Sequence, residues 1–410
     1  MNPFEQKSIA VEKAFIPQSK LYSKPYDKDN VSPFTKLRII LMNGTEFENI
    51  FFMHNFSRHC SNNDIRRELA LMREQEQMQQ KRIGGLKPTN EGILEHTIAY
   101  EQLAIELTAI LAKREKDENV RMGLDFALLE DFDHLYRFSN LLHLEDGIDA
   151  VKLVGKQTEI MPARPTVSHH RHPIDNVRAY TDFKYANNQT KVNTMIITAA
   201  EQQTMNYYMN VSPLYKTDFG RKLYSEIGLV EEEHVTQYGS LIDPNSTMLE
   251  CLLMHEYVEC YLYWSCFLDE TNPYVKEIWQ EHLEIELSHL HKAAELLEKY
   301  EGKHYLRVLP DPNFPPPLTF GSNKDYVREK LLTVNLTSFR ENYIAVNKLP
   351  KNAEFFKFQD MFNKNLDKCP SHKVIQMYID KEGEDYRYQD KEHPITDLRD
   401  RTVDNTGLGR

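Results

Sequence analysis

The segment GLVEEEHVTQYG, residues 228–239, decides the fold class because it places Glu231 and His234 three residues apart in a helical pattern. Glu201 lies 30 positions before this Glu and 33 before the His. The same arrangement occurs twice more at the same two spacings, in Glu101, Asp131 and His134 and in Glu256, Glu286 and His289. An equal spacing found three times indicates an internal repeat.

Each copy is predicted to be a pair of antiparallel helices, because a returning helix must reach the level that the first one left. The midpoints of the copies fall near Lys116, Lys216 and Thr271, in polar, turn-like sequence. Each arm then has about 12 to 14 residues, or about 20 Å of helix.

The ionisable residues of the repeat fall on apolar stripes with helical periodicity. One stripe contains Leu124, Ala127, Leu128, Asp131, His134, Leu135, Phe138, Leu141 and Leu142. Glu130 and Asp133 fall outside this stripe. A carboxylate buried in an apolar stripe costs several kcal/mol unless it is paired or bound to a metal.

The repeat therefore predicts metal binding. Glu and His three residues apart share a helix face and can reach one ion, while a carboxylate from a facing helix bridges two ions. Mixed carboxylate and imidazole ligands suit iron or manganese better than calcium or magnesium. The predicted ligands are Glu101, Asp131, His134, Glu201, Glu231, His234, Glu256, Glu286 and His289.

Two copies, Glu201 with Glu231 and His234 and Glu256 with Glu286 and His289, resemble the half-sites of the ferritin-like di-metal carboxylate superfamily. This superfamily includes rubrerythrins, manganese catalases, bacterioferritins and encapsulated ferritins. The resemblance covers residues 89–300 and implies an antiparallel helical bundle. It also implies a role for each ligand: terminal for Glu101 and Glu201, bridging for Asp131 and Glu231, and one metal each for His134 and His234. Asp131 departs from the family's Glu by one methylene, and the chain lacks the Cys-x-x-Cys module of rubrerythrins.

Chain reach predicts which pairs form a site. Between His134 and Glu201 lie 67 positions, enough to cross the length of a bundle, whereas His234 and Glu256 are only 22 apart. The short connection favours an antiparallel turn at residues 239–243. We therefore expect pairs one and two to form the main site. The third pair would be a half-site that a second copy of the chain completes, or would hold nothing.

Four further histidines are candidate ligands. His282 lies on the stripe of Glu286 and is either an extra ligand or a hydrogen-bonded core histidine. His169, His170 and His172 could cap the site or bind metal transiently, but a solvated loop is the favoured interpretation.

The rest of the chain is assigned to two extensions. Residues 1–88 are expected to hold a short hairpin around Asn43-Gly44 and an exposed helix at residues 63–80. Residues 301–410 are expected to hold a Pro-rich linker, a helix near residues 325–346 and a charged tail at residues 380–410 that is poorly ordered or wrapped on the surface. The predicted fold class is mainly α, with the bundle at residues 89–300.

Composition excludes several classes of function. A net charge of -12 argues against nucleic-acid binding. The most apolar run, residues 251–268, carries His255, Glu256 and Glu259, which argues against a membrane span. Five cysteines without a Cys-x-x-Cys pair argue against disulfides and sulfur-ligated metal. Since the first residues also lack a signal-peptide pattern, a cytoplasmic location is expected.

Two functions remain open. The first is an oxidoreductase in which two iron or two manganese ions react with dioxygen or hydrogen peroxide, as in a ferroxidase, peroxidase or catalase. The alternative is a non-catalytic metal-binding or iron-storage protein that works in an assembly. A homo-oligomer is expected in either case.

Overall fold

The computed structural model describes residues 1–333, 337–338, 340, 343–365, 368–383 and 385. The chain is mainly α-helical, which confirms the predicted fold class. It divides into two compact units: unit 1 comprises Met1–Glu91, Tyr180–Gln203 and Ile242–Phe320, and unit 2 comprises Gly92–Ala179, Thr204–Leu241 and Gly321–Arg410. The chain thus alternates between the two units, each of which takes three segments, and this division differs from the three consecutive segments expected from the sequence.

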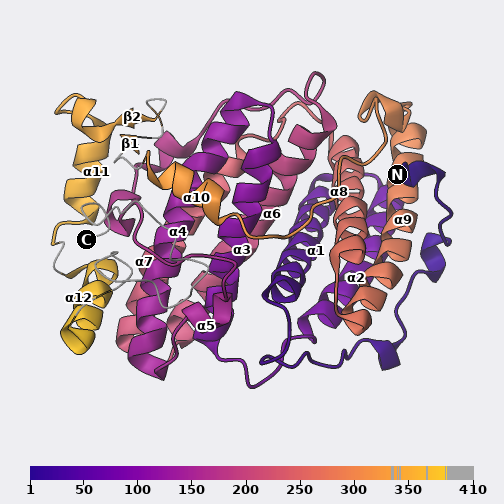
Figure 1. Ribbon diagram of the computed structural model, residues 1–410. Helices are drawn as coiled ribbons and strands as arrows, with labels where there is room; N and C mark the ends of the chain where they lie inside the picture. Colours follow the sequence, from indigo (N-terminus) through magenta and orange to yellow (C-terminus); the bar gives the residue numbers. More distant parts are fainter. Residues whose placement is uncertain (334–336, 339, 341–342, 366–367, 384, 386–410) are drawn as a thin grey trace. The chain divides into compact units, whose positions relative to one another are not determined.

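Unit 1 is built on four long helices, which Figure 1 shows side by side. They are α1 (Pro33–His59), α2 (Asn63–Gly84), α8 (Met248–Asp269) and α9 (Pro273–Glu301). Helix α1 packs against α2 and α8, and α2 packs against α9. The short 3₁₀ helices of this unit are Pro3–Glu5, Val11–Lys13, Gln18–Lys20 and Tyr305–Arg307.

Helix α1 replaces the hairpin expected around Asn43-Gly44, so that prediction is wrong. The Asn-Gly signal is overridden because both residues have tertiary roles within the helix. The Asn43 side-chain amide donates to the Gln80 carbonyl on α2 at 3.3 Å. A Cβ at Gly44 would lie only 2.7 Å from Cβ of Gln203, so the missing side chain lets α6 approach α1 closely.

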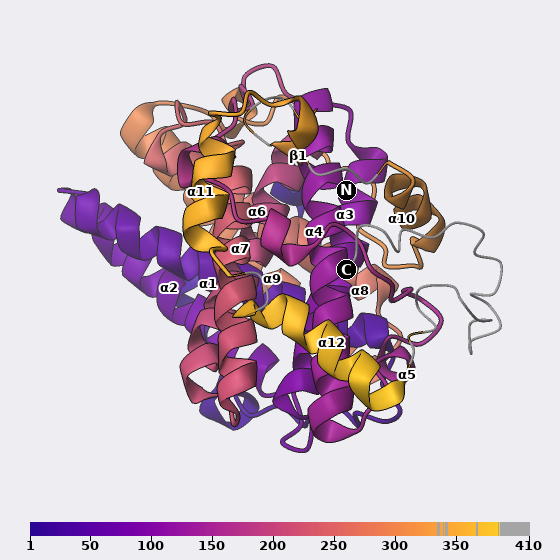
Figure 2. The ribbon, with the colours of Figure 1, turned by 90° about the vertical axis from the view of Figure 1, so that its left-hand side faces the viewer.

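Unit 2 contains α3 (Ile93–Arg114), α4 (Glu118–Asp146), α5 (Val151–Val154), α7 (Asp218–Gly239), α10 (Lys324–Leu331), α11 (Glu354–Phe362) and α12 (Pro370–Glu382). Helix α4 packs against both α3 and α7, and α12 packs across α4 and α7 (Figure 2). Its 3₁₀ helices are Thr166–Ser168, Pro173–Asn176, Ser212–Leu214 and Val346–Lys348. Two short strands, β1 (Thr337–Ser338) and β2 (Ile344–Ala345), pair antiparallel with Thr337 opposite Ala345.

Helix α6 (Asn188–Val211) is continuous across the boundary between the units, which falls after Gln203. The six helices expected at residues 90–300 are confirmed as α3, α4, α6, α7, α8 and α9. The helix expected at residues 63–80 is present as α2, but the expectation that it is exposed is wrong, because one of its faces is buried against the other helices of unit 1. The helix expected near residues 325–346 is shorter, because α10 ends at Leu331. Residues 384 and 386–410 of the predicted tail lie outside the described residues.

Side-chain caps fix where the ligand-bearing helices begin. Asp117 accepts from the Val120 backbone N–H at the start of α4, and Thr217 accepts from the Gly220 N–H at the start of α7. Thr247 and Asn272 cap α8 and α9 in the same way. Within the described residues, none of the helices combines the length and apolar character that crossing a bilayer requires. All five cysteines are free thiols.

Candidate metal centres

In unit 2, helices α3, α4 and α7 bring five of the predicted ligands together. Glu101, Asp131, His134, Glu231 and His234 are all at most 1% exposed. The turn between α3 and α4 occupies residues 115–117, midway between the first two acids, so these acids lie at the same level of the helical pair. The predicted turn at Lys116 is therefore confirmed.

The carboxylate of Glu231 lies between two imidazoles. Its Oε1 is 2.8 Å from Nδ1 of His134, and its Oε2 is 3.1 Å from Nδ1 of His234. The same His234 nitrogen is 3.3 Å from Oδ1 of Asp131. Ligand atoms of Glu101, His134 and Glu231 all lie within 4.8 Å of one another, as do those of Asp131, Glu231 and His234. These buried groups can hold metal ions.

Glu130, one residue before Asp131, sets the orientation of His234. Its Oε2 is 2.8 Å from Nε2 of His234, and Arg171 donates to its Oε1 at 2.6 Å. Burial alone would raise the pKa of Glu130, but Arg171 and neighbouring histidines hold that pKa well below its usual range. An ionised Glu130 accepts a hydrogen bond from the Nε2–H of His234, which leaves the Nδ1 lone pair of this histidine facing the carboxylates.

Glu130 and Asp133 lie outside the predicted stripe, yet both are buried because arginines face them. Arg137 donates to both oxygens of Asp133, at 2.6 and 2.9 Å, one turn along α4. Arg164 donates to Glu130 from the segment between α4 and α6. Sequence periodicity missed Glu130 because its partner cations, Arg164 and Arg171, come from a distant segment, whereas the cation that pairs with Asp133 lies on the same helix.

Tyr208 on α6 donates a hydrogen bond from its hydroxyl to Oε1 of Glu101. Burial and the nearby carboxylates raise the pKa of Tyr208 well above its usual value, so its hydroxyl keeps the proton that it donates. Glu201 lies seven residues earlier, on the part of α6 that belongs to unit 1, and is buried. Residues i and i+7 share one face of a helix, so Glu201 and Tyr208 point to the same side of α6.

The histidines after α4 are not on a solvated loop, so that prediction is wrong. His169 and His170 are at most 1% exposed, and His172 is partly buried. The His169 ring lies 5.4 Å from the His134 ring, and its Nε2 contacts the carbonyl of Arg164 at 2.7 Å. His169 thus packs beside a predicted ligand.

In unit 1, the third predicted pair meets helices α1 and α2 of the same chain. Nδ1 of His289 lies 2.9 Å from Glu76, 3.4 Å from Glu286 and 3.7 Å from Glu256. Ligand atoms of these four residues lie within 4.8 Å of one another, and all four side chains are fully buried. The carboxylate that joins this pair therefore comes from the same chain, and not from a second copy as one of the two expectations had it.

A fourth copy of the repeat lies on α1 and α2. Glu46 precedes Glu76 by 30 positions and Gln79 by 33, and each of these residues lies 55 positions before its counterpart in the first predicted copy, Glu101, Asp131 and His134. A search for Glu-x-x-His overlooks this copy because Gln79 replaces the His. The equal spacing was the signal that could have found it.

The cluster in unit 1 contains more oxygen ligands than the cluster in unit 2. Ligand atoms of Glu46, Glu76 and Glu259 form a second group within 4.8 Å of one another. The Asn49 amide donates to Glu259 at 2.8 Å and to Glu256 at 3.2 Å. Burial and the surrounding carboxylates raise the pKa of Glu46, Glu256 and Glu259 well above the usual range, so charging these acids without a cation is costly.

Tyr263 on α8 is the counterpart of Tyr208, 55 positions later, and its hydroxyl donates to Glu46. His282 contacts that hydroxyl through Nδ1 at 3.1 Å and belongs to neither group of ligand atoms. Of its two predicted roles, the structure therefore supports the hydrogen-bonded core histidine.

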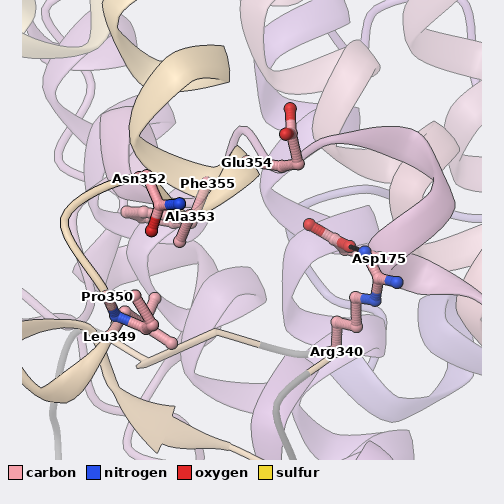
Figure 3. A pocket seen from close by; sticks show the side chains of 8 residues that line it. All are labelled: Asp175, Arg340, Leu349, Pro350, Asn352, Ala353, Glu354 and Phe355. Carbon is pink, nitrogen blue, oxygen red and sulfur yellow. Dashed lines mark hydrogen bonds and ion pairs between the residues drawn. The ribbon is translucent and has the colours of Figure 1, made fainter.

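A surface hollow in unit 2 involves none of the predicted ligands. It is lined by Asp175, Arg340, Leu349, Pro350, Asn352, Ala353, Glu354 and Phe355 (Figure 3). The Arg340 guanidinium lies 3.4 Å from the Asp175 carboxylate in this hollow, which leaves that acid paired with a cation.

Comparison of the chain with protein families, curated proteins and solved structures gave no match.

Proposed function

We propose that unit 2 holds a di-metal centre of the ferritin-like type and that the protein is an oxidoreductase acting on dioxygen or hydrogen peroxide. The observation that carries this proposal is Glu231, whose two oxygens each face the Nδ1 of a different histidine. A carboxylate in this position, with one imidazole on each side, suits a bridge between two ions.

The ligands divide into two sets in this proposal. Glu101 and His134 would hold one ion and His234 the other, Asp131 and Glu231 would be shared between the two sets, and Glu201 keeps the terminal role that the family resemblance implies. Iron or manganese suits this mixed set, and two such ions would supply the electrons exchanged with dioxygen or peroxide.

The surrounding residues prepare the site for this chemistry. Glu130 accepts a hydrogen bond from the Nε2–H of His234 and so fixes the nitrogen that faces the carboxylates. The hydroxyl of Tyr208 orients Glu101. Leu135 and Phe138 are fully buried on α4 and belong to the apolar core that keeps water from the site.

The variant Glu231→Gln tests the proposal, with Glu232→Gln as its control because Glu232 is exposed on the next position of α7. After reconstitution with Fe(II) or Mn(II), we expect Glu231→Gln to bind about two fewer ions per chain than the wild type. It should also lose reaction with dioxygen and peroxide, while Glu232→Gln keeps both properties. Equal metal content in the two variants would contradict the proposal.

The reaction type follows from adding dioxygen and peroxide separately to the loaded protein. Disproportionation of peroxide by the manganese form would identify a catalase. Oxidation of Fe(II) with slow iron release would identify the storage alternative. The cytoplasmic location and homo-oligomer expected from the sequence belong to the same proposal, and light scattering of the loaded protein tests the oligomer.

A further inference from the structure

We propose that unit 1 holds a second metal centre with two unlike positions. One position is formed by oxygen ligands alone, and the other has a single imidazole, that of His289. The inference rests on contacts within unit 1 and does not depend on the function proposed for unit 2.

The oxygen-only position lies among Glu46, Glu76 and Glu259, which come from α1, α2 and α8. The neighbouring position lies among Glu76, Glu256, Glu286 and His289. Glu76 belongs to both groups and so corresponds to the shared carboxylate of a two-ion site. Its place in the repeat matches Asp131 of unit 2.

Buried atoms that lack hydrogen-bond donors point into this cluster. Oε2 of Glu46, Oε1 of Glu259 and Oε1 of Gln79 are buried and have no hydrogen-bond partner in the part of the chain that the structure describes. The Gln79 amide group lies within the cluster, because its Nε2 donates to Glu286 at 2.6 Å and to Glu46 at 3.3 Å. Buried oxygens without donors are rare in folded proteins, and a cation would satisfy them.

The single imidazole is held as a ligand would be. Nε2 of His289 contacts the Gln75 side-chain oxygen at 2.8 Å, and Gln75 is itself fixed by donating to the Val11 carbonyl at 2.7 Å. A proton on Nε2 leaves the Nδ1 lone pair facing Glu76 and Glu286.

The ligand types predict which ions bind. Carboxylate and amide oxygens suit hard ions such as Mn²⁺, whereas imidazole favours Fe, Co and Zn. Because Gln79 replaces the histidine of the other three copies, the oxygen-only position should prefer Fe, Co and Zn over Mn²⁺ less strongly than a position with an imidazole does. Mn²⁺ is the probe that both positions accept.

The first experiment counts Mn²⁺ in the Glu231→Gln background, where the unit 2 site is disabled. Equilibrium dialysis should find about two Mn²⁺ per chain, and electron spin-echo spectra should show ¹⁴N coupling from one imidazole. Adding Glu46→Gln and Glu259→Gln should remove one ion and keep the ¹⁴N coupling. Adding His289→Ala instead should leave an ion without ¹⁴N coupling. Glu74→Gln, at an exposed position of α2, is the control and should change nothing.

The second experiment converts the site to the pattern of the other copies. Gln79→His should give the second ion ¹⁴N coupling and raise Co²⁺ affinity at that position at least about tenfold. Gln77→His places a histidine at an exposed position two residues away and should leave Co²⁺ binding unchanged. Circular dichroism in EDTA checks that each variant keeps its helices.

Two results would overturn the second centre: no stoichiometric Mn²⁺ in the Glu231→Gln background, or the same stoichiometry after Glu46 and Glu259 are both replaced. Either would mean that the cluster is a proton-sharing carboxylate network. Failure of the unit 2 proposal looks different, because Glu231→Gln would then bind as much metal as the wild type while the unit 1 variants still lose ions.

Discussion

Single neighbouring side chains decide which buried acids of this protein carry a charge. Glu130 and Glu106 are both almost fully buried in unit 2. Arg171 faces Glu130 and lowers its pKa, whereas Glu106 accepts hydrogen bonds from the neutral groups of Thr158 and Asn323. Burial therefore raises the pKa of Glu106 to about 7. The same residue type thus has opposite protonation behaviour at two sites.

Glu106 should make stability depend on pH. Its pKa is raised on folding, so the folded state keeps a proton that the unfolded state releases, and stability falls as pH rises from about 4.5 to about 7. The full effect is about 3 kcal/mol at most. Replacing this residue in Glu106→Gln should remove that dependence, measured as the change in urea midpoint between pH 5 and pH 8 in EDTA.

Glu118→Gln is the matched control for Glu106→Gln, because Glu118 is exposed at the start of α4. It should keep the wild-type loss of stability between pH 5 and pH 8. If Glu106→Gln and wild type lost the same stability over this range, the raised pKa of Glu106 would be refuted.

At the scale of elements, close approach of α1 and α6 depends on one glycine. In Gly44→Ala the new Cβ would lie 2.7 Å from Cβ of Gln203, so one helix must shift. We expect a loss of about 1 to 3 kcal/mol in unfolding free energy, despite the higher helix propensity of alanine. Chemical denaturation monitored by circular dichroism measures this loss.

Gly84→Ala is the comparison, because Gly84 ends α2 and its nearest neighbour is 3.6 Å from the new Cβ. That distance is ordinary contact, so alanine should leave stability unchanged or raise it by up to about 1 kcal/mol. Equal destabilisation by both substitutions would show that packing against Gln203 does not set the requirement for glycine.

At the scale of the whole molecule, one chain alternates between two compact units. Unit 1 contains helices α1, α2, α8 and α9, and the three segments of unit 2 follow α2, Gln203 and Phe320. Each unit carries its own buried cluster of carboxylates and histidine. Metal binding should therefore stabilise each unit separately.

Removing metal should lower the thermal stability of both units. An ion present at about 1,000 times its dissociation constant adds about 4 kcal/mol, or roughly 10 °C in Tm for a unit of this size. Differential scanning calorimetry with Mn²⁺ and with EDTA should show this shift. A chain carrying Glu231→Gln, Glu46→Gln and Glu259→Gln together should lose the shift of unit 2 and keep only the part of the unit 1 shift that comes from the ion at His289, and a full shift in that variant would place the metal elsewhere.

The sequence by itself determined the helices of the repeat and the burial of their ligands. The spacings of 30 and 33 between Glu101, Asp131 and His134 reflect an antiparallel pair with a short turn, which is a local property. Helical periodicity then predicted that the same residues lie on the inner face, because an apolar stripe can be recognised from a short stretch of sequence alone.

Tertiary structure alone decided which pairs meet and which other groups join them. The third pair, α8 and α9, meets α1 and α2. Helix α1 contains the Asn-Gly signal that predicted a hairpin, and α2 carries Gln79 where the other copies of the repeat have histidine. Glu130 is buried beside Arg164 and Arg171, which reach it from a distant segment. These outcomes depend on contacts between residues far apart in sequence, whose burial and charge balance no local pattern contains.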